Sequence, residues 1–139
     1  MAKRLDAIFA VVNSTEFNSD EVMDAFERKE YDRVVEMTLP HAIAGNSDAQ
    51  TQLSLLYQLG LAVKRDVLEA ERWLLKAAEQ NNAVAWNNLG TLYASQPPEL
   101  RHHWKDAMEC YQRAKELGLN VAEPYPPPLC SDPNDGKVA

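Results

Sequence analysis

The sequence has few of the residues that cross-link small secreted proteins or build catalytic loops. Its 139 residues include two cysteines and five glycines. Cys110 and Cys130 are too few for a disulfide framework, which favours a reducing compartment, the cytoplasm. No CxxC motif or Cys/His ladder surrounds them, so the spacing typical of a structural zinc site is missing too. We therefore expect one domain that is stabilised by its apolar core.

Long apolar runs and an excess of basic charge are also missing. No run is long enough to span a bilayer, and Lys3–Arg4 with residues 7–12 is too short for a signal peptide. We expect a soluble, unprocessed protein, with export as the minor alternative. The formal charge is −7, from 14 basic and 21 acidic residues. This balance disfavours nucleic-acid backbones and anionic membrane surfaces as partners.

An internal repeat is the main positive feature of the chain. The two copies are related by an offset of 36 in their first half and 37 in their second half. Small or apolar residues recur at these offsets: Ala49, Leu53 and Tyr57 align with Ala85, Leu89 and Tyr93, and Ala70, Trp73 and Ala77 align with Ala107, Cys110 and Ala114. Periods of this length indicate stacked helical hairpins, which bury their apolar faces against their neighbours.

Capping residues and apolar spacing predict two helices in each copy. The expected helices are residues 47–58, with Ser47 as N-cap and Gly60 as terminator; a helix that Asp66 caps and that ends at Asn81–Asn82; residues 83–95, capped by Asn82; and residues 104–117, ended by Gly118. Upstream, Asn18–Arg28 and residues 31–44 are predicted to form a divergent hairpin. Pro40 lies where the alignment requires a helix interior, so we expect a kink or a helix end near Leu39.

The motif that carries a family resemblance is Ala49-x3-Leu53-x3-Tyr57-x2-Gly60-x2-Val63-x2-Asp66-x3-Ala70-x2-Trp73-x2-Lys76-Ala77-Ala78, followed by Ala83-x-Ala85-x3-Leu89-Gly90-x2-Tyr93. Over residues 47–93 the chain resembles the Sel1-like repeat family, a branch of the tetratricopeptide-like helical repeats. This implies an all-α, right-handed solenoid of antiparallel hairpins with about two clear repeats. The expected units are an N-terminal cap (1–46), two repeats (47–82 and 83–118, the second with a degenerate second half) and a proline-rich tail (119–139).

The tail has two readings. Residues 124–128 have the composition of a polyproline segment, which serves either as a spacer lying over the last helix or as a docking peptide for an aromatic groove.

Candidate catalytic and metal-binding residues are sparse. His102, His103, Asp106 and Cys110 have some metal-binding character, but a mixed pair of ligands on one helix face does not make a site. The motifs GxSxG, HExxH, GxGxxG and the P-loop are absent, and Cys110 lies on an apolar stripe without a paired histidine. We therefore expect a solvated helix N-terminus, a structural thiol, no metal, no cofactor and no enzymatic activity.

The first helix of each repeat offers a candidate binding surface. In helical-hairpin solenoids these helices line the concave face. The outward positions expected there are Asp48, Thr51, Leu55, Gln58, Val84, Asn87, Asn88 and Thr91. Neither helix contains Lys or Arg, which disfavours peptides that end in a carboxylate. Neutral amides and hydroxyls, with the edges of Tyr57 and Tyr93, suit hydrogen bonding to a peptide or a helix, although mere solvation is the alternative.

Three hypotheses follow. The leading one is a non-catalytic module that binds a protein or peptide on its concave face, with the adaptor or scaffold role that the resemblance implies. The second is self-association, in which Trp104, Met108 and Tyr111 meet the apolar run Ile8–Val12 of another copy. The third, a metal site at His102 and His103, is disfavoured. An antagonist or assembly factor of a single partner protein would have the same sequence features.

Overall fold

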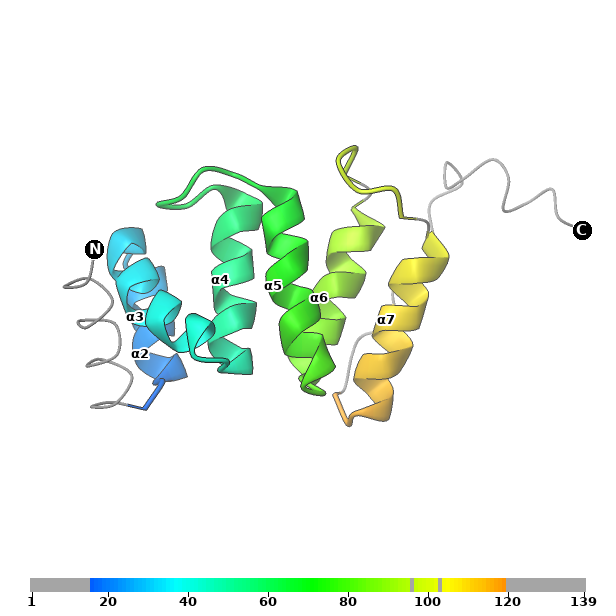
Figure 1. The fold of residues 1–139 in the computed structure, drawn as a ribbon, viewed down its shortest axis with the longest axis horizontal. Coiled ribbons are helices and arrows are strands. Elements are labelled where there is room, and N and C mark those ends of the chain that lie inside the picture. Colours follow the sequence, from blue (N-terminus) through cyan, green and yellow to red (C-terminus); the bar gives the residue numbers. More distant parts are fainter. Residues whose placement is uncertain (1–15, 96, 103, 120–139) are drawn as a thin grey trace, which may run out of the picture.

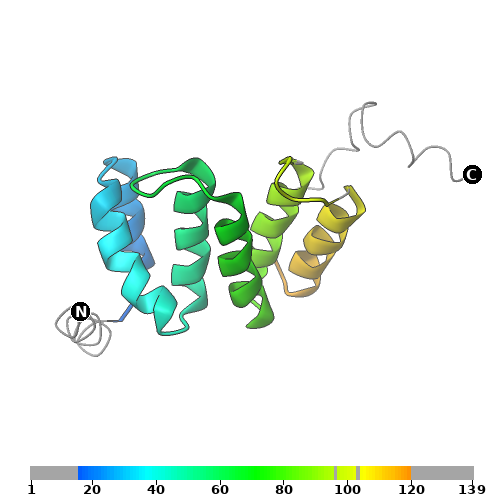
Figure 2. The same ribbon diagram turned by 45° about the horizontal axis from the view of Figure 1, so that its top comes forward.

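The computed structural model describes residues 16–95, 97–102 and 104–119. This part of the chain contains six helices and no strand: α2 (Ser19–Glu27), α3 (Tyr31–Ile43), α4 (Ser47–Leu59), α5 (Val67–Glu79), α6 (Ala83–Ala94) and α7 (Trp104–Glu116). The helices stand side by side in chain order, with α2 and α3 at one end of the row and α7 at the other (Figures 1 and 2). The fold is an all-α helical-repeat solenoid, as predicted. The run Ile8–Val12, His103 and the proline-rich segment 124–128 lie outside the described residues.

Side-chain oxygens cap four of the helices. Asn18, Asp66 and Asn82 accept hydrogen bonds from the first-turn amides of α2, α5 and α6, so the predicted caps Asp66 and Asn82 are confirmed. The prediction that Ser47 caps α4 is wrong. Asn46 has the extended backbone of a cap, and its side-chain oxygen accepts from the Ala49 amide at 3.0 Å. Ser47 is therefore the first residue of the helix.

Both predicted glycine terminators have left-handed backbone, with φ of +67° at Gly60 and +95° at Gly118. Of the two alternatives predicted at Pro40, a kink or a helix end near Leu39, the helix end is wrong, because α3 runs through Pro40 to Ile43. A proline in a helix removes one backbone hydrogen bond, at a cost of about 3 kcal/mol. Pro40 and the two residues after it, His41 and Ala42, are all buried, and this packing stabilises the last turn.

Small residues allow the helices to approach closely. All the predicted small positions are buried: Ala49, Ala70, Ala77, Ala85, Gly90, Ala107 and Ala114. At Gly90 the reason is visible, since a Cβ atom there would lie 2.9 Å from the ring of Tyr111 and 3.1 Å from the carbonyl oxygen of Ala107. Any larger side chain at this position would force α6 and α7 apart.

The apolar core consists of two clusters of side chains, and α5 contributes to both. One cluster joins α2, α3 and α4, and Trp73 of α5 packs against it. The other joins α5, α6 and α7, and Leu74, the next residue of α5, lies inside it. Consecutive residues of α5 therefore face opposite halves of the row.

Hydrogen bonds also join the first helices of the two repeats. The Asn82 side-chain amide, at the start of α6, donates to Ser47 Oγ at 3.0 Å and to Asp48 Oδ1 at 2.9 Å. Asn82 thus caps its own helix and ties it to the start of α4. Gln80 adds a further link, since its side-chain amide donates to Gln50 Oε1 at 3.0 Å.

Candidate functional site

The structure places most of the predicted concave residues at the surface of α4 and α6. Asp48, Val84 and Thr91 are exposed, and Leu55, Gln58, Asn87 and Asn88 are half-buried. Thr51 does not belong to this surface, because it is only 6% exposed. Its hydroxyl donates to the Ser47 carbonyl at 2.8 Å, so its polar atom is paired within the helix and needs no solvent.

Some of these residues are engaged within the protein. The Asp48 carboxylate accepts from Asn82, as described above. The Thr91 hydroxyl lies 3.2 Å from the Asn87 carbonyl oxygen and 3.1 Å from the Tyr111 hydroxyl. The amide side chains of Asn87 and Asn88 remain as half-buried neutral groups on α6, beside a helix surface that carries no Lys or Arg.

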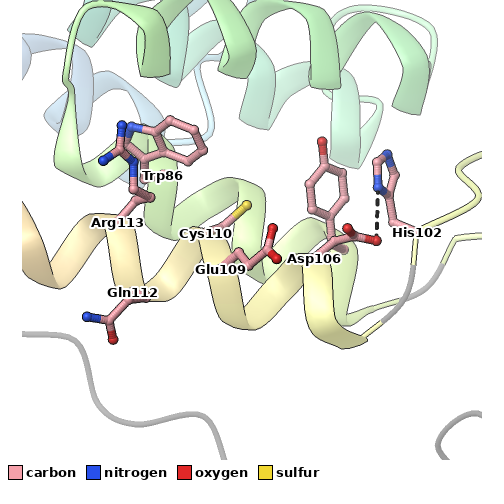
Figure 3. Close-up of a pocket in the computed structure, with 8 residues that line it drawn as sticks. Trp86, His102, Asp106, Glu109, Cys110, Gln112 and Arg113 are labelled. Atoms are coloured by element: carbon pink, nitrogen blue, oxygen red, sulfur yellow. Dashed lines mark ion pairs between the residues drawn. The ribbon is translucent and has the colours of Figure 1, made fainter. Parts of the chain in front are cut away.

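A second candidate site is a pocket of about 450 Å³ between α6 and α7, shown in Figure 3. We call it the α6–α7 pocket. Trp86 and Tyr93 line it from α6, His102 lines it from the loop before α7, and Glu109, Cys110 and Arg113 are among its α7 residues. Tyr93 was expected at the edge of the concave groove. It is buried instead, and it lines the α6–α7 pocket.

The α6–α7 pocket exists where the two repeats differ most in side-chain size. Cys110 occupies the position that Trp73 holds in the first repeat. Trp73 packs against the core there, and the Lys76 ammonium lies 4.6 Å from the centre of its ring. In the second repeat the indole comes from α6 instead, and the guanidinium of Arg113 lies 5.7 Å from the centre of the Trp86 ring. A thiol is much smaller than an indole, so space remains between α6 and α7.

A polar cluster closes one end of the α6–α7 pocket. The Tyr93 hydroxyl donates to Glu71 Oε2 of α5 at 2.8 Å, and the same oxygen lies 3.0 Å from His102 Nε2. The other ring nitrogen of His102 lies 3.4 Å from Asp106 Oδ2, and the ring stacks on Tyr93 at 3.8 Å. Burial, followed by the hydrogen bond to Glu71, raises the pKa of Tyr93 above its usual value. The cluster joins the loop before α7 to α5 and α6.

Two comparisons with known proteins identify the repeat. The Sel1 repeat family matches residues 47–82 and 105–119. The crystal structure of a Sel1 repeat protein from Oxalobacter formigenes superposes with a TM-score of 0.62 and 29% sequence identity, over 71% of this chain and 40% of that chain. Both comparisons support assigning the chain to the Sel1-like repeat family. The matched part of this chain covers less than half of the length of that solved relative. A comparison with curated proteins gives no match.

Sel1 repeats are generally protein–protein interaction modules and are typically non-catalytic. In this Sel1-like repeat protein, no three His, Cys, Asp or Glu side chains of the described segments gather closely enough to hold a metal ion. Of the residues considered for a metal, His102 faces carboxylates with both ring nitrogens, and Cys110 is buried. None of the six described helices is long and apolar enough to cross a membrane.

Sequence reasoning about this Sel1-like repeat protein missed the α6–α7 pocket. The signal was available, because the repeat alignment puts a cysteine opposite a tryptophan. That exchange indicates lost volume, but it does not show whether neighbouring side chains close the space. In the folded protein, Trp86 and Arg113 pack together beside this space and line the pocket that remains.

The thiol of Cys110 is expected to react slowly with alkylating reagents. Burial raises its pKa to about 12, and the carboxylates of Asp106 and Glu109 add to the rise. The thiolate is the reactive form, so at pH 8 the thiol in the folded Sel1-like repeat protein should react at least about a hundredfold more slowly than a free one. Iodoacetamide labelling of the Cys130→Ser variant, with and without urea, measures the ratio. Fast labelling of the folded variant would contradict the structural role of this cysteine.

Proposed function

We propose that this protein is a non-catalytic interaction module that binds a protein or peptide segment across the exposed surfaces of α4 and α6. The contact residues would be Asp48, Leu55, Gln58, Val84, Asn87, Asn88 and Thr91. The family supports the general role, since Sel1 repeats are generally protein–protein interaction modules. We propose that it acts as an adaptor or scaffold in the cytoplasm. It would need no cofactor and would have no nucleic-acid or membrane partner. The division of the chain into a cap, two repeats and a tail, with boundaries after residues 46, 82 and 118, is part of the same proposal.

One observation carries this proposal: the two helices have no basic residue, and their single acidic residue, Asp48, is bonded to Asn82. A ligand therefore meets neutral amides and hydroxyls, together with Val84, which is 46% exposed. Asn and Gln side chains both donate and accept hydrogen bonds, so they can pair with the backbone of an extended segment or with the polar face of a helix.

The test is a proximity-labelling or pull-down comparison in the native host. Partners captured by the natural chain should be lost with Asn87→Ala/Thr91→Ala and kept with Arg72→Ala, a control on α5, whose side chain is 71% exposed. Thr91 also contacts Tyr111 of α7, so its substitution could weaken the packing of the helices. Circular dichroism is therefore needed to establish that both variants are folded. If partners still bind the Asn87→Ala/Thr91→Ala variant and are lost with Arg72→Ala, the assignment of the binding surface is wrong.

Self-association is the second candidate, and exposed apolar side chains on and after α7 favour it. Met108 is 42% exposed and Leu117 is 40% exposed. Sedimentation of the full chain over a range of concentrations decides between the two, since a monomer at high concentration excludes a dimer interface as the function.

A further inference from the structure

We propose that the α6–α7 pocket is a second docking site, which takes an apolar side chain and a neighbouring Lys or Arg from a partner protein. This inference goes beyond the proposed function, because the pocket and the proposed α4–α6 surface lie on different sides of α6. Residues two positions apart in a helix point about 200° away from each other. Val84 and Thr91 are exposed members of the proposed surface, and Trp86 and Tyr93, two residues further on, line the pocket.

The apolar part of the site follows from the comparison of the two repeats. In the first repeat, the equivalent space is occupied by the Trp73 ring, which packs on the core cluster of α2, α3 and α4. In the second repeat, where Cys110 holds this position, a pocket of about 450 Å³ lies between Trp86 at one end and the stacked rings of Tyr93 and His102 at the other. A volume of this size is in the range of ligand pockets, and aromatic walls favour an apolar side chain.

The basic part of the ligand follows from charge. Glu109 is exposed, lines the pocket beside Cys110 and raises the pKa of its thiol (Figure 3). Its carboxylate makes no hydrogen bond or ion pair with another described residue, whereas Arg113 lies over Trp86 and pairs with Glu116 at 3.4 Å. The net charge of −7 attracts cationic segments to the protein as a whole. A Lys or Arg of the partner would therefore pair with Glu109.

The indole of Trp86 is already engaged within the protein, because the guanidinium of Arg113 lies 5.7 Å from its centre. The ligand cation is therefore assigned to Glu109, and Trp86 serves as an aromatic wall of the pocket. An anionic ligand would instead meet Glu109 and Asp106. These observations select a basic protein segment over phosphate or nucleic acid for the α6–α7 pocket.

Blocked tripeptides test the proposal on the full chain. The probes are acetyl-Leu-Arg-Leu-amide and its Gln and Glu counterparts, added at millimolar concentration to ¹⁵N-labelled protein. We expect the Arg peptide to shift the Trp86 indole resonance and the backbone amides of residues 109–113. The Gln peptide should bind about two- to fivefold more weakly, as expected for the loss of one surface ion pair, and the Glu peptide more weakly still. Absence of shifts, or shifts confined to Asn87 and Asn88, would overturn the proposal.

Two variants separate the pocket from general charge attraction. Glu109→Gln changes an exposed residue and should remove the preference for Arg over Gln. Cys110→Trp restores the residue found at position 73 and should abolish the shifts at Trp86. If Cys110→Trp does not fold, the Glu109→Gln result decides, and an unchanged preference for Arg refutes the site. Asn87→Ala/Thr91→Ala should leave peptide binding intact, so failure of the concave surface and failure of the pocket are distinguishable.

Discussion

Leu74→Ala is expected to lower the free energy of unfolding by about 3 kcal/mol. Leu74 has no exposed surface and lies in the cluster that joins α5, α6 and α7. Truncation to alanine removes three buried carbon atoms and leaves a cavity, and such changes cost about 2–5 kcal/mol. Alanine itself favours the helix, so the loss comes from packing rather than from helix propensity. Urea unfolding followed by circular dichroism measures the difference.

Leu75→Ala is the matched control for this experiment. It makes the same chemical change one residue further along α5, at a side chain that is 39% exposed. We expect a loss below about 1 kcal/mol, because a substantial part of this side chain is in contact with water already and its removal leaves no closed cavity. Equal losses at the two positions would mean that α5 does not face α6 and α7 as described.

Glu71→Ala is expected to cost about 2 kcal/mol. One carboxylate oxygen of Glu71 contacts both the Tyr93 hydroxyl, at 2.8 Å, and the His102 ring, at 3.0 Å. Tyr93 is only 5% exposed, so its hydroxyl would lose its partner with little access to water. Leaving a buried polar group unpaired costs about 1–3 kcal/mol. The variant should also release the loop before α7, and amide hydrogen exchange at residues 100–102 reports this directly.

Glu79→Ala provides the comparison for Glu71. It lies on the same helix and is exposed, and within the described residues its carboxylate makes no hydrogen bond or ion pair. We expect a change within about 0.5 kcal/mol. A Glu71→Ala variant that is as stable as Glu79→Ala, with unchanged exchange in the loop, would show that the cluster does not hold the loop in place.

Much of the fold could be predicted because its determinants are local. The helices expected over residues 47–58 and 83–95 are observed as Ser47–Leu59 and Ala83–Ala94. Asparagine and aspartate caps, glycine terminators and alanines at repeated positions act over a few residues, so they are legible in a sequence. The two errors differ in origin. Pro40 lies inside α3 and is buried there, although proline disfavours a helix interior. At the start of α4 the error is local, because the adjacent residue Asn46 has the same capping capacity and is the N-cap.

The binding surfaces show the same division. Helical periodicity places Asp48, Val84 and Thr91 correctly at the surface, because it requires only the phase of the helix. It fails at Thr51, whose hydroxyl is satisfied inside its own helix. The α6–α7 pocket depends on which side chains occupy the volume that Cys110 leaves, and this is decided by residues of α6, α7 and the loop between them. No local pattern contains that information.

The sharing of α5 between the two core clusters has a consequence for how the protein loses its structure. Repeat arrays are stabilised by contacts between neighbours, and they unfold piecewise when those contacts are weak. Here Trp73 and Leu74 anchor one helix in both halves, so neither half can melt without exposing a buried face of the other. The described helices should therefore unfold cooperatively, in a single transition, despite the modular origin of the sequence.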